Sequence, residues 1–169
     1  AVNWTRNGFL CERGGIMSFI RMGFAILLAM FLSAGAALAE TRKLGPEEIK
    51  ALTVKAAELI ASKGIVEAEK VFLQEGDFKF GEIYVNVIDF DGKWVVYPPK
   101  PENRGKSILQ FVDEDGRKLG EEILATGKAG EGWTEYRWKN PATNTIQSKV
   151  TFVKRVPGAN LIAYIGVYK

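Results

Sequence analysis

The spacing of apolar residues divides the chain into a helical part and a strand-rich part. Between Pro46 and Lys63, apolar residues recur every three or four positions, at Ile49, Leu52, Ala56, Leu59 and Ile60. This spacing places them on one face of an amphipathic helix. Gly64 interrupts the pattern, and a second helical stretch is predicted from Ile65 to about Leu73.

Apolar residues then recur at every second position, which is typical of strands. Two β-rich runs, 82–90 and 93–97, are separated by Asp91 and Gly92, a dipeptide that favours a tight hairpin. Three prolines follow within 98–105, and they predict a loop because proline cannot donate to a strand ladder.

The remaining strands complete the predicted sheet. Residues from Lys118 to about Thr126 have weak helical character. Turns rich in Pro, Asn and Gly separate the later strands. These three strands are expected at 132–138, 146–154 and 161–168. Helices followed by five strands predict an α+β fold with an antiparallel sheet.

The N-terminal region has the pattern of a secretory signal. From Met17, a short basic segment leads into an apolar run over 23–34, and the small residues Ala37 and Ala39 follow. We therefore predict a signal peptide at 17–39 with cleavage before Glu40, since the apolar run is short for a membrane span. An uncleaved membrane anchor is the alternative.

Residues 1–16 lack an initiator methionine and precede a plausible start. We interpret them as a gene-model or cloning extension. The mature domain is expected to span 40–169 and to reside in the periplasm. It contains no cysteine, so it must fold by burial alone, without a disulfide.

Composition removes most catalytic classes. The chain has no histidine, one cysteine and a net charge of +3, which excludes histidine triads and cysteine clusters and argues against nucleic acid as a partner. Two acidic turns, 89–92 and 113–116, resemble the starts of calcium loops but lack the remaining ligands. We therefore expect no enzyme activity, no metal and no cofactor.

Several short motifs together resemble one known family, the single Cache domain of PAS-like extracytoplasmic sensors. The resemblance covers roughly 61–169. Its motifs are Tyr84 to Gly92, Tyr97-Pro98, Gly105-Lys106, Asp113 to Gly116, Gly132-Trp133, Tyr136 to Pro141, Lys149 to Pro157 and Gly166 to Tyr168.

The resemblance implies a PAS-like five-stranded antiparallel sheet, a long N-terminal helix and a pocket for a small ligand. Relatives typically sense organic acids such as acetate, propionate, lactate or pyruvate. No second span or kinase follows the last strand, so we expect a secreted sensor that signals through a membrane receptor or kinase partner. A homodimer through the N-terminal helix is a further expectation. Tyr97-Pro98 replaces the common family His-Pro, which leaves the ligand open.

Lys149 is the first candidate ligand-binding residue. A lysine within a strand is costly unless its ammonium group meets water or an anion, so it could face a pocket and bind a carboxylate. The alternative is a solvated face shared with Gln147 and Thr151. The family position of this lysine favours the pocket.

Aromatic residues supply the other candidates. Tyr136 and Trp138 share one strand face by alternation, and either could line a pocket or simply pack in the core. Tyr97 ends its strand at the proline loop, and Tyr84 could contribute a hydroxyl group or face solvent. Arg104, in the loop, could bind a carboxylate in a bidentate manner or remain solvated.

The leading hypothesis is a non-enzymatic periplasmic domain that binds a small organic anion. Lys149 would be its charge partner, and Tyr97 and Tyr136 would be hydroxyl donors. Two alternatives remain: a structural or interaction subunit that binds no ligand, and a membrane-anchored truncated receptor.

Overall fold

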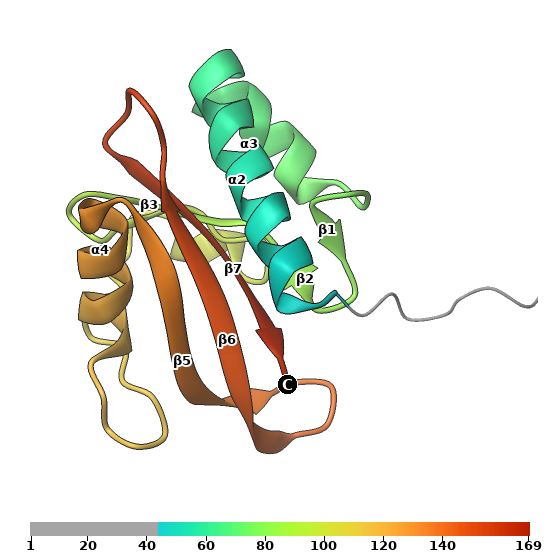
Figure 1. Ribbon diagram of the computed structural model, residues 1–169, viewed down its shortest axis with the longest axis vertical. Coiled ribbons are helices and arrows are strands. Elements are labelled where there is room, and N and C mark those ends of the chain that lie inside the picture. The colour runs from blue at the N-terminus through green and yellow to red at the C-terminus, as the bar shows by residue number, and fades with distance from the viewer. Residues whose placement is uncertain (1–43) are drawn as a thin grey trace, which may run out of the picture. The chain divides into compact units, whose positions relative to one another are not determined.

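The computed structural model describes residues 44–169, and Figure 1 shows how their helices and strands are arranged. The predicted extension at 1–16, the signal peptide at 17–39 and the cleavage site before Glu40 lie outside the described residues. None of the helices within 44–169 is long and apolar enough to cross a membrane.

The two N-terminal helices form at the predicted positions. Helix α2 spans Pro46–Lys63 and helix α3 spans Ile65–Leu73. The carboxylate of Glu48 accepts a hydrogen bond from the backbone N–H of Gly45 at 2.9 Å, which satisfies one unpaired donor at the start of α2. Gly64 ends α2 with a φ of +79°, a conformation that favours glycine.

The five-stranded antiparallel sheet is also confirmed. Its strand order is β4-β3-β7-β6-β5, so the last strand in the sequence lies at the centre. The strands are β3 (Asn86–Asp89), β4 (Trp94–Val96), β5 (Glu131–Asn140), β6 (Thr145–Arg155) and β7 (Leu161–Tyr168). With α2 packed on the sheet, this is the predicted α+β architecture.

The run predicted as one strand at 82–90 is divided in the structure. Strand β2 (Ile83–Tyr84) pairs with β1 (Lys79–Phe80), which the sequence did not predict, whereas β3 pairs with β4 and β7. The chain changes pairing partner at Val85, which is fully buried. Side-chain alternation continues through this exchange, and therefore the pattern could not reveal it.

Each face of the sheet is covered by a different helix. Helix α2 packs on β6 and β7, and α3 packs against α2. On the other face lies α4 (Leu119–Ala129), which is longer than the predicted helical segment and contacts β5, β6 and β7. Figure 1 shows α2 and α3 on one side of the sheet and α4 on the other. Two apolar cores result, one on each face.

Candidate ligand-binding site

A cavity lies on the α4 face of the sheet. Its volume is about 70 Å³, and its wall is formed by strands β2 to β7, the start of α4 and the segment that precedes α4. A water molecule needs roughly 10–15 Å³ measured in this way, so the cavity has room for a few waters or a small organic molecule. Its aromatic wall residues are Tyr84, Trp94, Tyr97, Phe111, Tyr136, Trp138 and Tyr164.

Lys149 is the only charged residue among the described residues that line this cavity. Its side chain is 6% exposed, and its ammonium nitrogen lies 4.4 Å from the ring centre of Tyr168 and 5.7 Å from that of Tyr84. Strand register explains this placement, because Lys149 lies opposite Tyr136 on β5 and opposite Tyr168 on β7. No hydrogen bond or ion pair joins this nitrogen to another residue of 44–169.

Burial perturbs the charge of Lys149. Desolvation disfavours the ammonium form and lowers the pKa of Lys149 to about 8, while the carboxylate of Glu82 opposes this shift. The side chain therefore remains largely charged at neutral pH inside an aromatic wall. A buried ammonium group without an acidic partner is the arrangement that an organic anion would complete.

Gly166 provides the space in which Lys149 lies. A Cβ atom at this position on β7 would contact the side chain of Thr151 and would lie 2.8 Å from Cε of Lys149. Any larger residue would therefore displace the two polar side chains of β6 that line the cavity.

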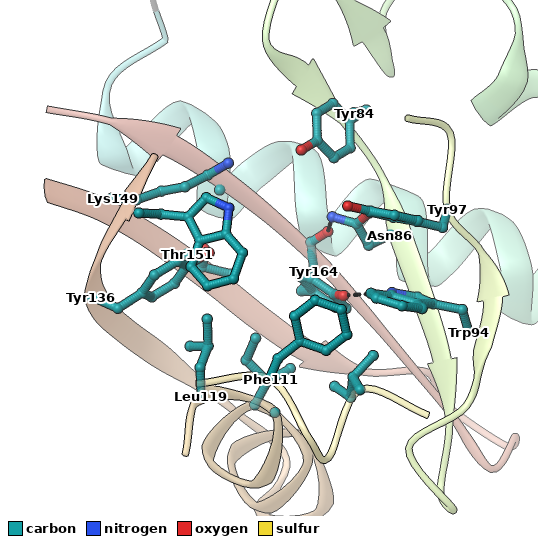
Figure 2. A pocket seen from close by; sticks show the side chains of 15 residues that line it. Tyr84, Asn86, Trp94, Tyr97, Phe111, Leu119, Tyr136, Lys149, Thr151 and Tyr164 are labelled. Atoms are coloured by element: carbon teal, nitrogen blue, oxygen red, sulfur yellow. Dashed lines mark hydrogen bonds between the residues drawn. The ribbon is translucent and has the colours of Figure 1, made fainter. Parts of the chain in front are cut away.

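Four tyrosine hydroxyl groups belong to the cavity wall. Tyr136 Oη lies 2.9 Å from Thr151 Oγ1. Tyr164 Oη accepts a hydrogen bond from Trp94 Nε1 at 3.0 Å, which is drawn as a dashed line in Figure 2. The hydroxyl groups of Tyr84 and Tyr97 make no hydrogen bond to another residue of 44–169.

All four tyrosines are expected to remain protonated at physiological pH. Burial raises the pKa of Tyr136 to about 12 and raises the pKa of Tyr84, Tyr97 and Tyr164. Each hydroxyl group can therefore act as a hydrogen-bond donor to an anion.

The structure brings five of the six predicted site residues to this cavity. They are Tyr84, Tyr97, Tyr136, Trp138 and Lys149. Lys149 does not share a solvated face, since it is buried.

Arg104 does not line the cavity. Its guanidinium group forms an ion pair with Glu69 of α3 at 2.6 Å. A long side chain in a loop can turn in several directions, and here a carboxylate on the neighbouring helix binds it.

Sequence reasoning missed five wall residues that are central to the geometry: Asn86, Trp94, Phe111, Thr151 and Tyr164. Asn86 is buried, and its Oδ1 atom has no hydrogen-bond partner among the described residues. A polar residue between two valines, Val85 and Val87, was the available signal for Asn86. Tyr164 and Gly166 lie on the same face of β7 by alternation. Because both faces of this strand are apolar, the sequence did not indicate which face would line a cavity.

Comparison with known proteins identifies related folds. The solved structure of a methyl-accepting chemotaxis protein from Vibrio parahaemolyticus is 16% identical and has a TM-score of 0.61, covering 89% of this chain and 96% of that chain. A second structure, described as the basis for carboxylic acid recognition by a Cache chemosensory domain, is 18% identical with a TM-score of 0.55 and covers 92% and 99%. At these identities, both matches establish the fold.

A sequence match adds one curated relative. The sensor histidine kinase MctS of Rhizobium johnstonii is 36% identical over 85 residues, which are 50% of this chain and 18% of the kinase. The aligned part is therefore a small fraction of that protein. Residues 29–169 match the single Cache domain 2 family (sCache_2), which is most of the chain. The protein with this five-stranded sheet and aromatic, lysine-containing cavity belongs to the single Cache domain 2 family.

Proposed function

We propose that this domain binds a small organic acid in the cavity and acts as an extracytoplasmic sensor in signal transduction. The observation that supports this function most directly is the buried ammonium group of Lys149, which faces the cavity with no acidic partner among residues 44–169. Organic acids of the acetate, propionate, lactate or pyruvate type would supply the missing negative charge.

The remaining polar groups of the wall suit the same ligand. The hydroxyl groups of Tyr84 and Tyr97 are free to donate, and no carboxylate side chain lines the cavity within the described part of the chain. Hydrogen-bond donors around one cation favour an acceptor-rich anion, and the aromatic rings suit its short hydrocarbon part. A similar structure concerns carboxylic acid recognition by a Cache domain, which agrees with this proposal.

The proposed setting is the periplasm, with a membrane receptor or histidine kinase as partner. The predicted signal peptide supports this location, and a similar solved structure is described as the periplasmic sensor domain of a chemotaxis protein. The match to a sensor histidine kinase supports the kind of partner. A homodimer through the N-terminal helix remains part of the proposal.

Isothermal titration calorimetry with short acids tests the proposed function. We expect acetate, propionate, lactate or pyruvate to bind, and we expect propionamide, a neutral amide of similar shape, to bind at least about tenfold more weakly because it cannot neutralise Lys149. Equal binding of the acid and the amide would contradict the role of charge. No binding of any acid would favour a structural or interaction subunit instead.

The affinity for the acid should depend on pH. The pKa of Lys149 is lowered to about 8, so the ammonium form that attracts the anion is lost as the pH rises through that value. The acid itself remains ionised throughout this range. We expect the affinity to be nearly constant between about pH 6 and 7 and to fall roughly tenfold between about pH 7 and 9.

Other titratable groups near Lys149 should not produce this effect. Glu82 on the turn before β2 favours the charged lysine, and the neighbouring tyrosines Tyr84, Tyr136 and Tyr168 have raised pKa values that keep them neutral. Calorimetry across this pH range measures the change. An affinity that stays constant from about pH 7 to 9 would show that Lys149 is not the charge that binds the acid.

A further inference from the structure

The hydroxyl group of Tyr164 has a fixed hydrogen-bonding role. An indole N–H can only donate, so in the 3.0 Å contact between Trp94 Nε1 and Tyr164 Oη the tyrosine oxygen is the acceptor. The hydroxyl hydrogen of Tyr164 must therefore point away from Trp94. Among residues 44–169, no atom accepts a hydrogen bond from it.

Packing holds this arrangement in place. The ring of Trp94 is stacked on Tyr97 with centres 4.3 Å apart, and Phe111 meets Trp94 edge-on at 5.1 Å. Tyr164 itself is 7% exposed and lines the cavity. Because the indole cannot turn easily, Tyr164 presents a donor that water or a ligand in the cavity must satisfy.

Tyr164 and Lys149 lie at separate places on the wall. Figure 2 shows the Lys149 nitrogen near Tyr84, while the Tyr164 hydroxyl group lies near Trp94 and Phe111. A ligand that contacts both therefore needs hydrogen-bond acceptors at two positions. The second acceptor should be uncharged, because the described residues of the wall supply no cation besides Lys149.

We propose that Tyr164 is a second recognition point, at which its hydroxyl group donates to a neutral oxygen that the acid carries beside its carboxylate. The preferred ligand class is a short 2-hydroxy or 2-oxo acid, in preference to an unsubstituted acid of the same length. This inference rests on the proposed function and adds a specificity to the same cavity. The Tyr164 hydroxyl group distinguishes the two kinds of acid because only the substituted acid carries a second, uncharged oxygen that can accept its hydrogen bond.

Three acids with the same three-carbon skeleton test the inference: propionate, lactate and pyruvate. We expect lactate, pyruvate or both to bind the wild-type protein about tenfold more tightly than propionate, the effect of one satisfied buried hydrogen bond. Comparing lactate with pyruvate shows whether a hydroxyl or a carbonyl oxygen is preferred. Calorimetry at fixed pH gives the three affinities.

The Tyr164→Phe variant should remove this preference. We expect the advantage of lactate or pyruvate to fall to about twofold or less, while propionate keeps its affinity within about threefold. In this variant the Trp94 N–H loses its acceptor, but it cannot take over the role of the hydroxyl group. In the wild-type protein Trp94 Nε1 lies 3.0 Å from Tyr164 Oη, and stacking on Tyr97 holds the indole ring in place. Tyr168→Phe is the matched control: the Tyr168 hydroxyl group donates to the carbonyl oxygen of Lys139 instead, so the preference should persist.

The outcomes separate this inference from the proposed function. If propionate binds as tightly as lactate and pyruvate, or if the preference survives in Tyr164→Phe, the second recognition point is refuted while acid binding stands. If none of the three acids binds, the proposed function itself fails. The wild-type ranking can refute the inference even if the Tyr164→Phe protein does not fold.

Discussion

Replacing Lys149 with methionine should abolish acid binding and, at the same time, stabilise the ligand-free protein. Methionine has nearly the same length and fills the same space, but it carries no charge. The loss of a buried charge-assisted contact to the carboxylate should lower the affinity at least about hundredfold. The gain in stability follows from removing a charge that is buried at a cost in the ligand-free state.

The sign of the stability change follows from the pKa. Burial lowers the pKa of Lys149 from its ordinary value to about 8, so the unfolded chain holds the proton more tightly than the folded protein. Below about pH 8, both states are charged and the full cost of burial opposes folding. As the pH rises further, the folded protein loses the proton first, and the stability of the wild-type protein rises.

We therefore expect Lys149→Met to raise the free energy of unfolding by roughly 1–3 kcal/mol at neutral pH. The lower part of this range allows for the lost contacts of the ammonium group with the rings of Tyr168 and Tyr84. Near pH 10, the difference in the free energy of unfolding between Lys149→Met and the wild-type protein should become smaller, because Lys149 is then neutral in the folded wild-type protein. Urea unfolding followed by tryptophan fluorescence at both pH values measures this difference.

Lys154 offers a matched control on the same strand. Lys154 lies on the opposite face of β6 and pairs with Glu131 at 2.5 Å. Lys154→Met should change stability by less than about 1 kcal/mol and should leave the affinity for the acid unchanged. A Lys149→Met protein that binds acid normally, or that is markedly less stable than wild type at neutral pH, would contradict the proposed role of Lys149.

The sequence was sufficient to predict the main elements because their signals are local. Helix α2 begins at Pro46 and ends before Gly64, and both residues act through their own backbone preferences. The division of 82–90 into β2 and β3 depends instead on which strand pairs with which. Strand β1, with two residues, is too short to show any periodicity.

The cavity was predictable only in part, for a similar reason. Alternation could place Tyr136 and Trp138 on one face of their strand. The position of Lys149 within a strand indicated that burial of its ammonium group would be energetically unfavourable without an anion. It could not show that Trp94 would fix the donor direction of Tyr164, because the two residues are far apart in the sequence and meet only in the folded sheet. Arg104 could equally have reached the cavity, since nothing in a loop sequence specifies its partner.

The Gly120→Ala variant should be strongly destabilised, although alanine is the better helix former by about 1 kcal/mol. Gly120 lies in the first turn of α4, where its N–H donates to the carbonyl oxygen of Phe111 at 3.1 Å. A Cβ atom there would overlap the carbonyl oxygen of Ile108 and lie 3.0 Å from Cα of Leu109. Backbone atoms cannot rotate away from the new Cβ atom as a side chain can. Helix α4 and the segment that contains Ile108 and Leu109 must therefore move apart.

This separation would affect the cavity, because Ile108, Phe111 and Gly120 all belong to its wall. We expect the free energy of unfolding to fall by about 3 kcal/mol and acid binding to weaken together with it. Gly45→Ala is the control, since its Cβ would meet only the Glu48 carboxylate at 3.8 Å, and its cost should be no more than about 1 kcal/mol. A Gly120→Ala protein as stable as wild type would mean that α4 and the loop are not in such close contact, and the cavity wall would then have to be placed differently.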